Sequence, residues 1–216
     1  MKNKKILIIV VVLILICLLS GLGYYFIKKR QEPIKQSEKK AQITQIYENL
    51  VSNPVYKFSL TLDDKNNMIV SIKNDKANID MLTEGEHLTK IVKDNNTYLL
   101  VHPREKYYIY QNNELELAKI TSSLEKIKEK DYKKGKEEIN DTKYTYEEFE
   151  NYNSMMLKYA EDITEENSKT RFYFNKENKL EYIKTIWNDK EELLKVDLTY
   201  EVEDTLFDIP ENFKQG

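Results

Sequence analysis

A long apolar run near the start of the sequence constrains the chain more than any other feature. Residues 6–27 form an unbroken stretch of 22 uncharged residues, with three lysines before it and the segment KKR after it. A helix of that length measures roughly 33 Å at about 1.5 Å per residue, which is enough to cross a bilayer core of about 30 Å. A helix also pairs its own backbone N–H and C=O groups, as hydrocarbon requires. The run therefore predicts a transmembrane signal anchor over residues 6–27.

Two other interpretations of this run compete with an uncleaved anchor. A cleaved secretory signal needs a small-residue cleavage site after an apolar core of about 7–15 residues. Residues 21–23, GLG, are a weak version of such a site. A lipoprotein signal places a cysteine directly after a small residue at the end of the apolar core, whereas Cys17 follows Ile16 inside the run. The length of the run favours the uncleaved anchor over both.

The charges that flank the run predict its orientation. Each flank carries three cationic side chains, and the N-terminal amine adds a further positive charge before the run. Because positive charge is retained on the cytoplasmic side, we expect residues 1–5 to be a short cytoplasmic tail. The expected location is the cell membrane, crossed once, with the C-terminal domain outside the cytoplasm. The frequent lysine, asparagine and isoleucine residues suggest a bacterial protein.

The part of the chain after the run is acidic, although the whole chain is close to neutral. The net charge is −3, but residues 41–216 hold 35 acidic and 25 basic residues. An acidic domain is repelled by phosphate backbones, so we expect no nucleic-acid partner. The single cysteine, Cys17, lies in the apolar run, so residues 41–216 contain neither a disulfide nor a cysteine nucleophile.

Hydrophobic periodicity predicts the first elements of a domain over residues 41–216. Residues 28–40 are charged and contain one proline, which is typical of a solvated stalk. In residues 41–53 apolar side chains recur at helical spacing. From residue 55 the period changes to two, and turn residues recur about every ten positions, which predicts an antiparallel meander. The predicted strands are 55–62, 68–73, 79–83, 88–93, 97–102 and 107–111.

The later part of the sequence predicts further helices and strands. Residues 114–130 carry one apolar stripe, with acidic residues early and lysines late, as a helix dipole favours. Residues 136–149 predict a hairpin, and residues 150–168 are ambiguous, with a third helix as one interpretation. Strands are predicted over 169–174, 180–187 and 192–202. The predicted fold class is α+β: a large curved antiparallel sheet (half-barrel) covered by two or three helices, preceded by one N-terminal transmembrane helix.

Three phrases of the sequence, together with this order of elements, resemble a known family. Residues 93–110, KDNNTYLLVHPREKYYIY, and residues 135–149, GKEEINDTKYTYEEF, look like two of its hairpins. Residues 202–214, VEDTLFDIPENFK, look like its usual ending. Over roughly residues 41–214 the chain resembles the LolA-like superfamily of lipoprotein carriers. The resemblance implies a half-barrel closed by helices around an apolar cavity. The predicted anchor departs from the freely moving carriers, so a shuttle role does not follow.

The sequence contains no obvious group of catalytic or metal-binding residues. His87 and His102 are the only histidines, and no cysteine accompanies them at metal-ligand spacing. Acidic pairs are frequent, as expected on the solvated faces of so acidic a domain. The sequence has no G-x-S-x-G motif and no glycine-rich phosphate loop. We therefore expect no enzyme activity, no catalytic residue, no metal and no cofactor.

The clearest strand alternations identify apolar side chains on the inner face of the predicted sheet. Packing within the sheet is the simplest role for such residues, and contact with an apolar ligand in a cavity is the alternative. The candidate ligand-contacting residues are Phe58, Leu60, Leu62, Val70, Ile72, Phe172, Phe174, Leu194, Val196 and Leu198.

Two functional hypotheses follow from the sequence. In the first, the protein is a membrane-anchored extracytoplasmic binding domain that holds a lipid, a lipoprotein segment or another apolar ligand between the sheet and the helix at 114–130. In the second, it is a structural or interaction subunit of a bacterial envelope or secretion complex, with an envelope protein and no small ligand as its partner. A co-purifying acyl chain would favour the first hypothesis, and a protein partner without lipid would favour the second.

Overall fold

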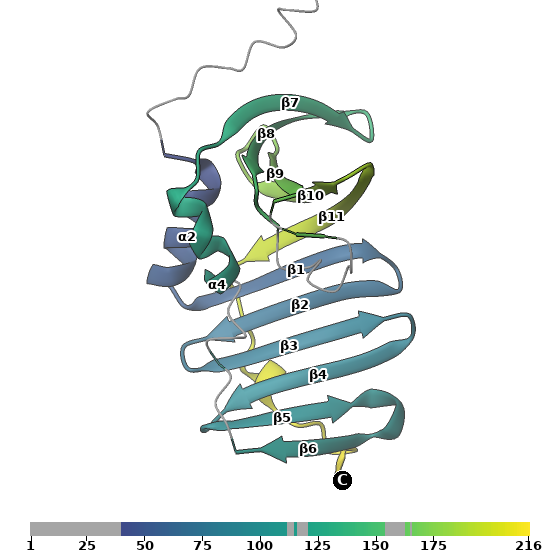
Figure 1. The fold of residues 1–216 in the computed structure, drawn as a ribbon. Helices are drawn as coiled ribbons and strands as arrows, with labels where there is room; N and C mark the ends of the chain where they lie inside the picture. The colour runs from purple at the N-terminus through teal and green to yellow at the C-terminus, as the bar shows by residue number, and fades with distance from the viewer. Residues whose placement is uncertain (1–39, 112–114, 116–120, 154–162, 165) are drawn as a thin grey trace, which may run out of the picture. The chain divides into compact units, whose positions relative to one another are not determined.

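A single large sheet forms the centre of the domain. The computed structural model describes residues 40–111, 115, 121–153, 163–164 and 166–216. Residues Ser37–Gly216 form one compact unit. Its strands are β1 Val55–Asp63, β2 Asn66–Lys73, β3 Lys76–Thr83, β4 Glu86–Lys93, β5 Asn96–Val101, β6 Lys106–Tyr110, β7 Lys133–Ile139, β8 Thr142–Glu150, β9 Ser168–Phe174, β10 Leu180–Trp187, β11 Lys190–Thr199 and β12 Lys214–Gln215. They form one 12-stranded sheet in the order β12-β6-β5-β4-β3-β2-β1-β11-β10-β9-β8-β7, which curls at its β7–β11 end (Figure 1).

Short turns with left-handed residues set the register of the hairpins. Asp94 and Asn95 between β4 and β5 both have positive φ, as do Asn140 and Asp141 between β7 and β8. Two successive left-handed residues give a turn whose twist matches that of the paired strands. Asparagine and aspartate tolerate this conformation better than other residues that carry a Cβ atom. The turn chemistry therefore fixes which residues face each other across these hairpins.

Most of the predicted elements that fall on described residues are confirmed, with shifts at their ends. The six predicted meander strands are β1–β6, and the hairpin of residues 136–149 is β7 and β8. The helix predicted over 41–53 is α2, Gln42–Ser52. The last turns of the helix predicted over 114–130 are α4, Thr121–Leu124, and a 3-10 helix, η2, Glu125–Glu129. Most of the rest of that segment, and most of the third helix considered within 150–168, lie outside the described residues.

The main core lies on one face of the sheet, beneath α2 and α4. Tyr56, Phe58 and Leu60 alternate along β1, and each is 1% exposed. Phe58 pairs with Val70 on β2 and Leu60 with Val196 on β11, so this apolar face continues across the three strands. The apolar sides of α2, α4 and η2 pack into the same cluster. The two α-helices lie side by side against the sheet (Figure 1).

A second, smaller core lies on the opposite face of β3–β5. We call residues 203–216 the C-terminal segment. It crosses this face as a 3-10 helix, η4, Asp204–Phe207, and then adds β12 beside β6. Phe207 is 1% exposed and packs with Ile91 and Leu100 of the sheet. The last part of the chain thus covers a sheet face that neither α2 nor α4 covers.

These observations show that the predicted fold class is wrong. The sheet is mixed, because β12 runs parallel to β6. Within the described residues α2 is the one α-helix longer than four residues, so one helix and the single turn of α4 take the place of the predicted cover of two or three helices. The physical reason lies in the middle strands, where neighbouring residues such as Ile91 and Val92 are both buried and both faces therefore need cover. The C-terminal segment provides that cover on the second face.

The predicted transmembrane helix is likewise not supported. None of the helices that the structure describes is both long enough and apolar enough to span a membrane. The predicted tail, anchor and nearly all of the stalk, residues 1–39, lie outside the described residues. The observed fold is therefore a mixed 12-stranded sheet with a core on each face.

A side chain from a distant strand holds the N-terminus of α2. Glu147 on β8 is 2% exposed. Its two carboxylate oxygens accept hydrogen bonds from the backbone N–H groups of Gln42, at 2.8 Å, and Ile43, at 3.0 Å. The first N–H groups of a helix have no partner within the helix, and the helix dipole favours negative charge there. Glu147 therefore ties the covering helix to the curled end of the sheet.

Candidate binding site

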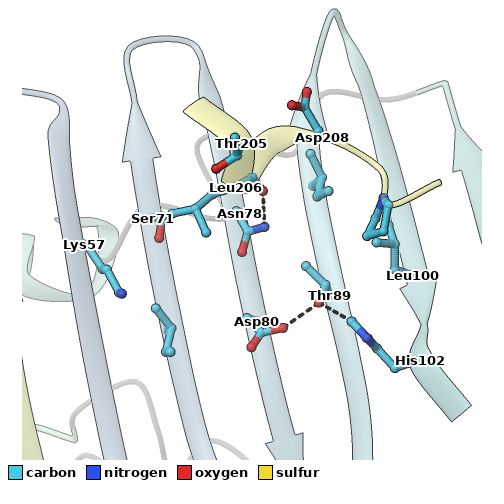
Figure 2. Close-up of a pocket in the computed structure, with 13 residues that line it drawn as sticks. Lys57, Ser71, Asn78, Asp80, Thr89, Leu100, His102, Thr205, Leu206 and Asp208 are labelled. Carbon is cyan, nitrogen blue, oxygen red and sulfur yellow. Dashed lines mark hydrogen bonds between the residues drawn. The ribbon is translucent and has the colours of Figure 1, made fainter. Parts of the chain in front are cut away.

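A cavity of about 280 Å³ lies between the sheet and the C-terminal segment. Strands β1–β5 form its floor, and the segment around η4 forms its roof (Figure 2). The roof is held to the floor by hydrogen bonds, in which Asn78 Nδ2 donates to the carbonyl of Leu206 at 2.6 Å and Lys93 Nζ donates to that of Phe207 at 2.7 Å. The lining residues are Lys57, Ile69, Ser71, Asn78, Asp80, Thr89, Ile91, Leu100, His102, Thr205, Leu206, Asp208 and Pro210.

Strand register brings the polar residues of the floor together. One row across the sheet holds Lys57, Ser71 and Asn78, since Lys57 pairs with Ser71 and Ser71 with Asn78. The next row holds Asp80 and Thr89, which pair across β3 and β4. All of these side chains face the second core because they alternate with residues of the main core.

The floor ends in a hydrogen-bonded group formed by Asp80, Thr89 and both histidines of the chain. The Thr89 hydroxyl lies 2.5 Å from Asp80 Oδ1 and 2.7 Å from His102 Nε2. His87 Nε2 lies 2.8 Å from the same Asp80 oxygen. A carboxylate can only accept, so Thr89 donates its single proton to Asp80 and must accept from His102. Both histidines then carry their proton on Nε2. Thr89 and His87 donate to the Asp80 carboxylate directly, and His102 is joined to it through Thr89.

The two imidazole rings are stacked beside this group. Their centroids are 3.5 Å apart and their planes differ by 11°. His102 also contacts the ring of Phe213 edge-on, at 5.1 Å between centroids, so the C-terminal segment packs on the stack. Partial burial and the adjacent His87 lower the pKa of His102, and the charge of Asp80 acts in the opposite direction. His102 is therefore neutral at neutral pH.

The opposite end of the cavity presents a cation. Lys57 is half-buried, and no carboxylate of the described residues forms an ion pair with it. By contrast, Lys93 and Lys73 beneath the C-terminal segment both have acidic partners, Asp208 at 4.0 Å and Asp204 at 3.0 Å. Ser71, next to Lys57 in the same row, is 1% exposed and offers a hydroxyl. This end of the cavity thus suits an anionic group.

The predicted apolar contact residues lie elsewhere. Leu198 is partly buried, and Leu62 is 45% exposed. None of the ten predicted residues lines the cavity described above. Their role in ligand contact stays a prediction, and lipid binding has no support in the structure. Eight of them are at most 3% exposed in the main core: Phe58, Leu60, Val70, Ile72, Phe172, Phe174, Leu194 and Val196.

Sequence alone does not reveal the group around Asp80, because its members lie on β3, on β4 and at His102, the residue that follows β5. The turn at Asp94 and Asn95 sets the register that brings the two histidines together. Counting outward from that turn places His102 opposite His87, as the Leu88–Val101 pair beside them confirms. Strand alternation alone predicts on which face of the sheet each residue lies, but not which residue lies beside it on the next strand.

A second group of charged side chains lies on the outer face of β7–β10, and none of its members lines the cavity. Glu137 accepts hydrogen bonds from Lys184 Nζ at 2.7 Å, Arg171 Nη1 at 2.8 Å and the Tyr173 hydroxyl at 2.6 Å. Arg171 Nε also bonds Glu148, at 2.6 Å. Because each charge in this group has an opposite partner, we interpret it as a structural network.

The network predicts a pH-dependent contribution to stability. Partial burial opposes ionisation of Glu137, but the bonds from Lys184 and Tyr173 outweigh it and lower the pKa of this carboxyl below its ordinary value of 4.5. A carboxyl with a lowered pKa stabilises the fold above the unfolded-state pKa, and this contribution is lost as pH falls through the folded-state pKa. The melting temperature of Glu137→Gln should therefore fall below that of the wild type at pH 7. The difference should shrink below about pH 4. A difference that is independent of pH would contradict this assignment.

Comparison with known proteins identifies no family. No family model matches the chain, and no curated protein does. Among solved structures, the chain is similar to an uncharacterized conserved protein from Thermus thermophilus, with 9% sequence identity and a TM-score of 0.44. The match covers 82% of this chain and 99% of that chain. A likeness at this TM-score carries no argument, and the LolA-like resemblance stays an expectation.

Proposed function

We propose that the domain is a binding module, without catalytic activity, for a small monocarboxylate solute in the cavity under the C-terminal segment. The position of Lys57 is the observation that supports this proposal. It places an ammonium group in a partly enclosed cavity, without an acidic partner among the described residues. Away from bulk water a charge without a partner is costly, and a bound carboxylate would offset that cost.

The rest of the lining limits the ligand. The Ser71 hydroxyl can donate to a second carboxylate oxygen, since Ser71 pairs with Lys57 across β1 and β2. Asp80 and Asp208 also line the cavity and would repel a polyanion, so a single carboxylate fits better than a phosphate or a dicarboxylate. The volume of about 280 Å³ lies at the lower end of small-molecule pockets, which suits a solute of a few carbon atoms.

Propionate and its neutral analogue propionamide test this proposal in the full-length chain. Each is titrated in the presence of EDTA and followed by isothermal calorimetry and by amide chemical shifts. We expect propionate to bind, to shift the amides of β1, β2 and η4, and to bind more tightly than propionamide. Lys57→Met should weaken propionate binding by about tenfold or more, because a hydrogen bond to a charged group contributes about 1.5–3 kcal/mol.

Lys195→Met is the matched control. Lys195 is exposed on β11 and lies outside the cavity lining, so its loss should leave the affinity unchanged. Equal binding of propionamide and propionate, or an unchanged affinity in Lys57→Met, would show that the cavity does not select a carboxylate through Lys57.

A further inference from the structure

We propose that Asp80, His87 and His102 form a binding site for a divalent transition-metal ion of the zinc type. The three side chains come from β3, β4 and the first residue of η1, His102–Arg104. One ligand atom from each lies within 4.8 Å of the other two. The site adjoins the cavity of the proposed function, but it does not require that a carboxylate bind there.

The distances between the ligand atoms are close to those of a metal centre. Bonds of about 2.0–2.2 Å in tetrahedral geometry separate neighbouring ligand atoms by about 3.3 Å. His87 Nε2 and Asp80 Oδ1 are already 2.8 Å apart. The side chains of these two residues are 36% and 32% exposed, so an ion can reach them from solvent and they have room to adjust. Small side-chain movements therefore suffice to gather the set around one ion.

Metal binding requires two local changes at the histidines. Each imidazole carries its proton on Nε2 in the hydrogen-bonded group, so this proton must move to Nδ1 before Nε2 can donate its lone pair. The rings must also tilt out of their 3.5 Å stack, because each lone pair lies in its own ring plane. A neutral histidine remains neutral through this tautomer change, so it releases no net proton.

Thr89 supports the site without acting as a ligand. Its hydroxyl donates to Asp80 Oδ1 and thus orients the carboxylate from the next strand. Such second-layer hydrogen bonds align ligands and commonly change metal affinity by about 10–100-fold. When the metal replaces the Nε2 protons, the bond from Thr89 to the carboxylate can remain.

The donor set selects the class of metal. Two imidazole nitrogens and one carboxylate oxygen suit zinc and neighbouring first-row ions, whereas calcium and magnesium prefer oxygen ligands alone. Three protein ligands leave at least one position open for water or a small ligand. Because Asp80 and His102 both line the cavity, that open position lies next to it.

The experiment titrates the EDTA-treated full-length chain with zinc chloride alone. We expect one ion per chain with a dissociation constant in the micromolar range or below, and visible absorption bands when cobalt(II) is used instead. Nitrogen-15 spectra of the wild-type histidines should show that zinc shifts both Nε2 signals and moves the proton to Nδ1. This readout needs no variant, so a misfolded mutant cannot obscure it.

Variants then assign the ligands. His87→Gln and Asp80→Asn should each weaken zinc binding by about tenfold or more. Asp189→Asn, in the exposed turn between β10 and β11, should leave zinc binding unchanged. Lys57→Met should also retain zinc while losing propionate, and His87→Gln should retain propionate in EDTA. Absence of stoichiometric zinc binding, or unchanged histidine nitrogen signals, would overturn the metal site and leave the carboxylate proposal standing.

Discussion

Replacing Leu60 with alanine should lower the free energy of unfolding by about 2–5 kcal/mol, the range observed when a buried leucine is truncated. Leu60 is 1% exposed and lies between Met68 of β2 and Val196 of β11. Truncation removes its burial energy and leaves a space that the paired strands cannot close. Urea unfolding followed by circular dichroism measures the loss as a lower midpoint with an unchanged slope.

Leu62 provides the matched control on the same strand. It lies two residues further along β1, where the pairing with β2 shifts register between Thr61 and Asp63, and it is 45% exposed. We expect Leu62→Ala to change stability by less than about 0.5 kcal/mol. If both variants changed the free energy of unfolding equally little, Leu60 would not be a core residue. Its predicted role as a ligand contact would then be favoured.

Glu147→Ala should destabilise the domain by about 3 kcal/mol, because it removes two charge-assisted hydrogen bonds at a buried helix terminus. The N–H groups of Gln42 and Ile43 would lose their acceptor, and that of Ile43 is buried. Glu147→Gln should have an intermediate effect, since the amide keeps one acceptor oxygen but loses the charge that favours the helix dipole. Hydrogen exchange should show the largest loss of protection in α2.

Glu150 is the matched control for Glu147. It is exposed on the same strand, and its one ion pair among the described residues is with Lys133, which is also exposed. An exposed ion pair contributes between about 0 and 1 kcal/mol, so Glu150→Ala should have little effect. Equal losses in Glu147→Ala and Glu150→Ala would mean that the contact with α2 does not stabilise the helix.

The local elements could be predicted because their causes are local. In residues 55–62 alternating apolar and polar side chains predict a strand with one buried face, and β1 has that pattern. The Asn140–Asp141 turn predicts the hairpin of β7 and β8, since its residues tolerate positive φ. For α2 the helical spacing of the apolar residues was sufficient to predict the helix. These signals depend on a few neighbouring residues and hardly on the rest of the fold.

The cover of the sheet and the candidate site depend on contacts between distant residues. Nothing near Phe207 in the sequence indicates that it packs on Ile91 and Leu100, more than a hundred residues earlier. The same holds for Glu147, whose partners are Gln42 and Ile43. Acidic pairs are expected on solvated faces, and yet the side chains of the pair Glu147 and Glu148 are both buried.

The sequence by itself determined strands β1–β11, the turns between them and most of the inward side chains of the first core. The reason is that side-chain periodicity and turn conformation are set within a few residues. Only the tertiary structure decided that the C-terminal segment covers the second face and encloses a cavity against it. It also decided that Asp80, His87 and His102 meet at the end of that cavity. Those outcomes come from strand register and from the burial of a second apolar face, which act between residues far apart in the chain.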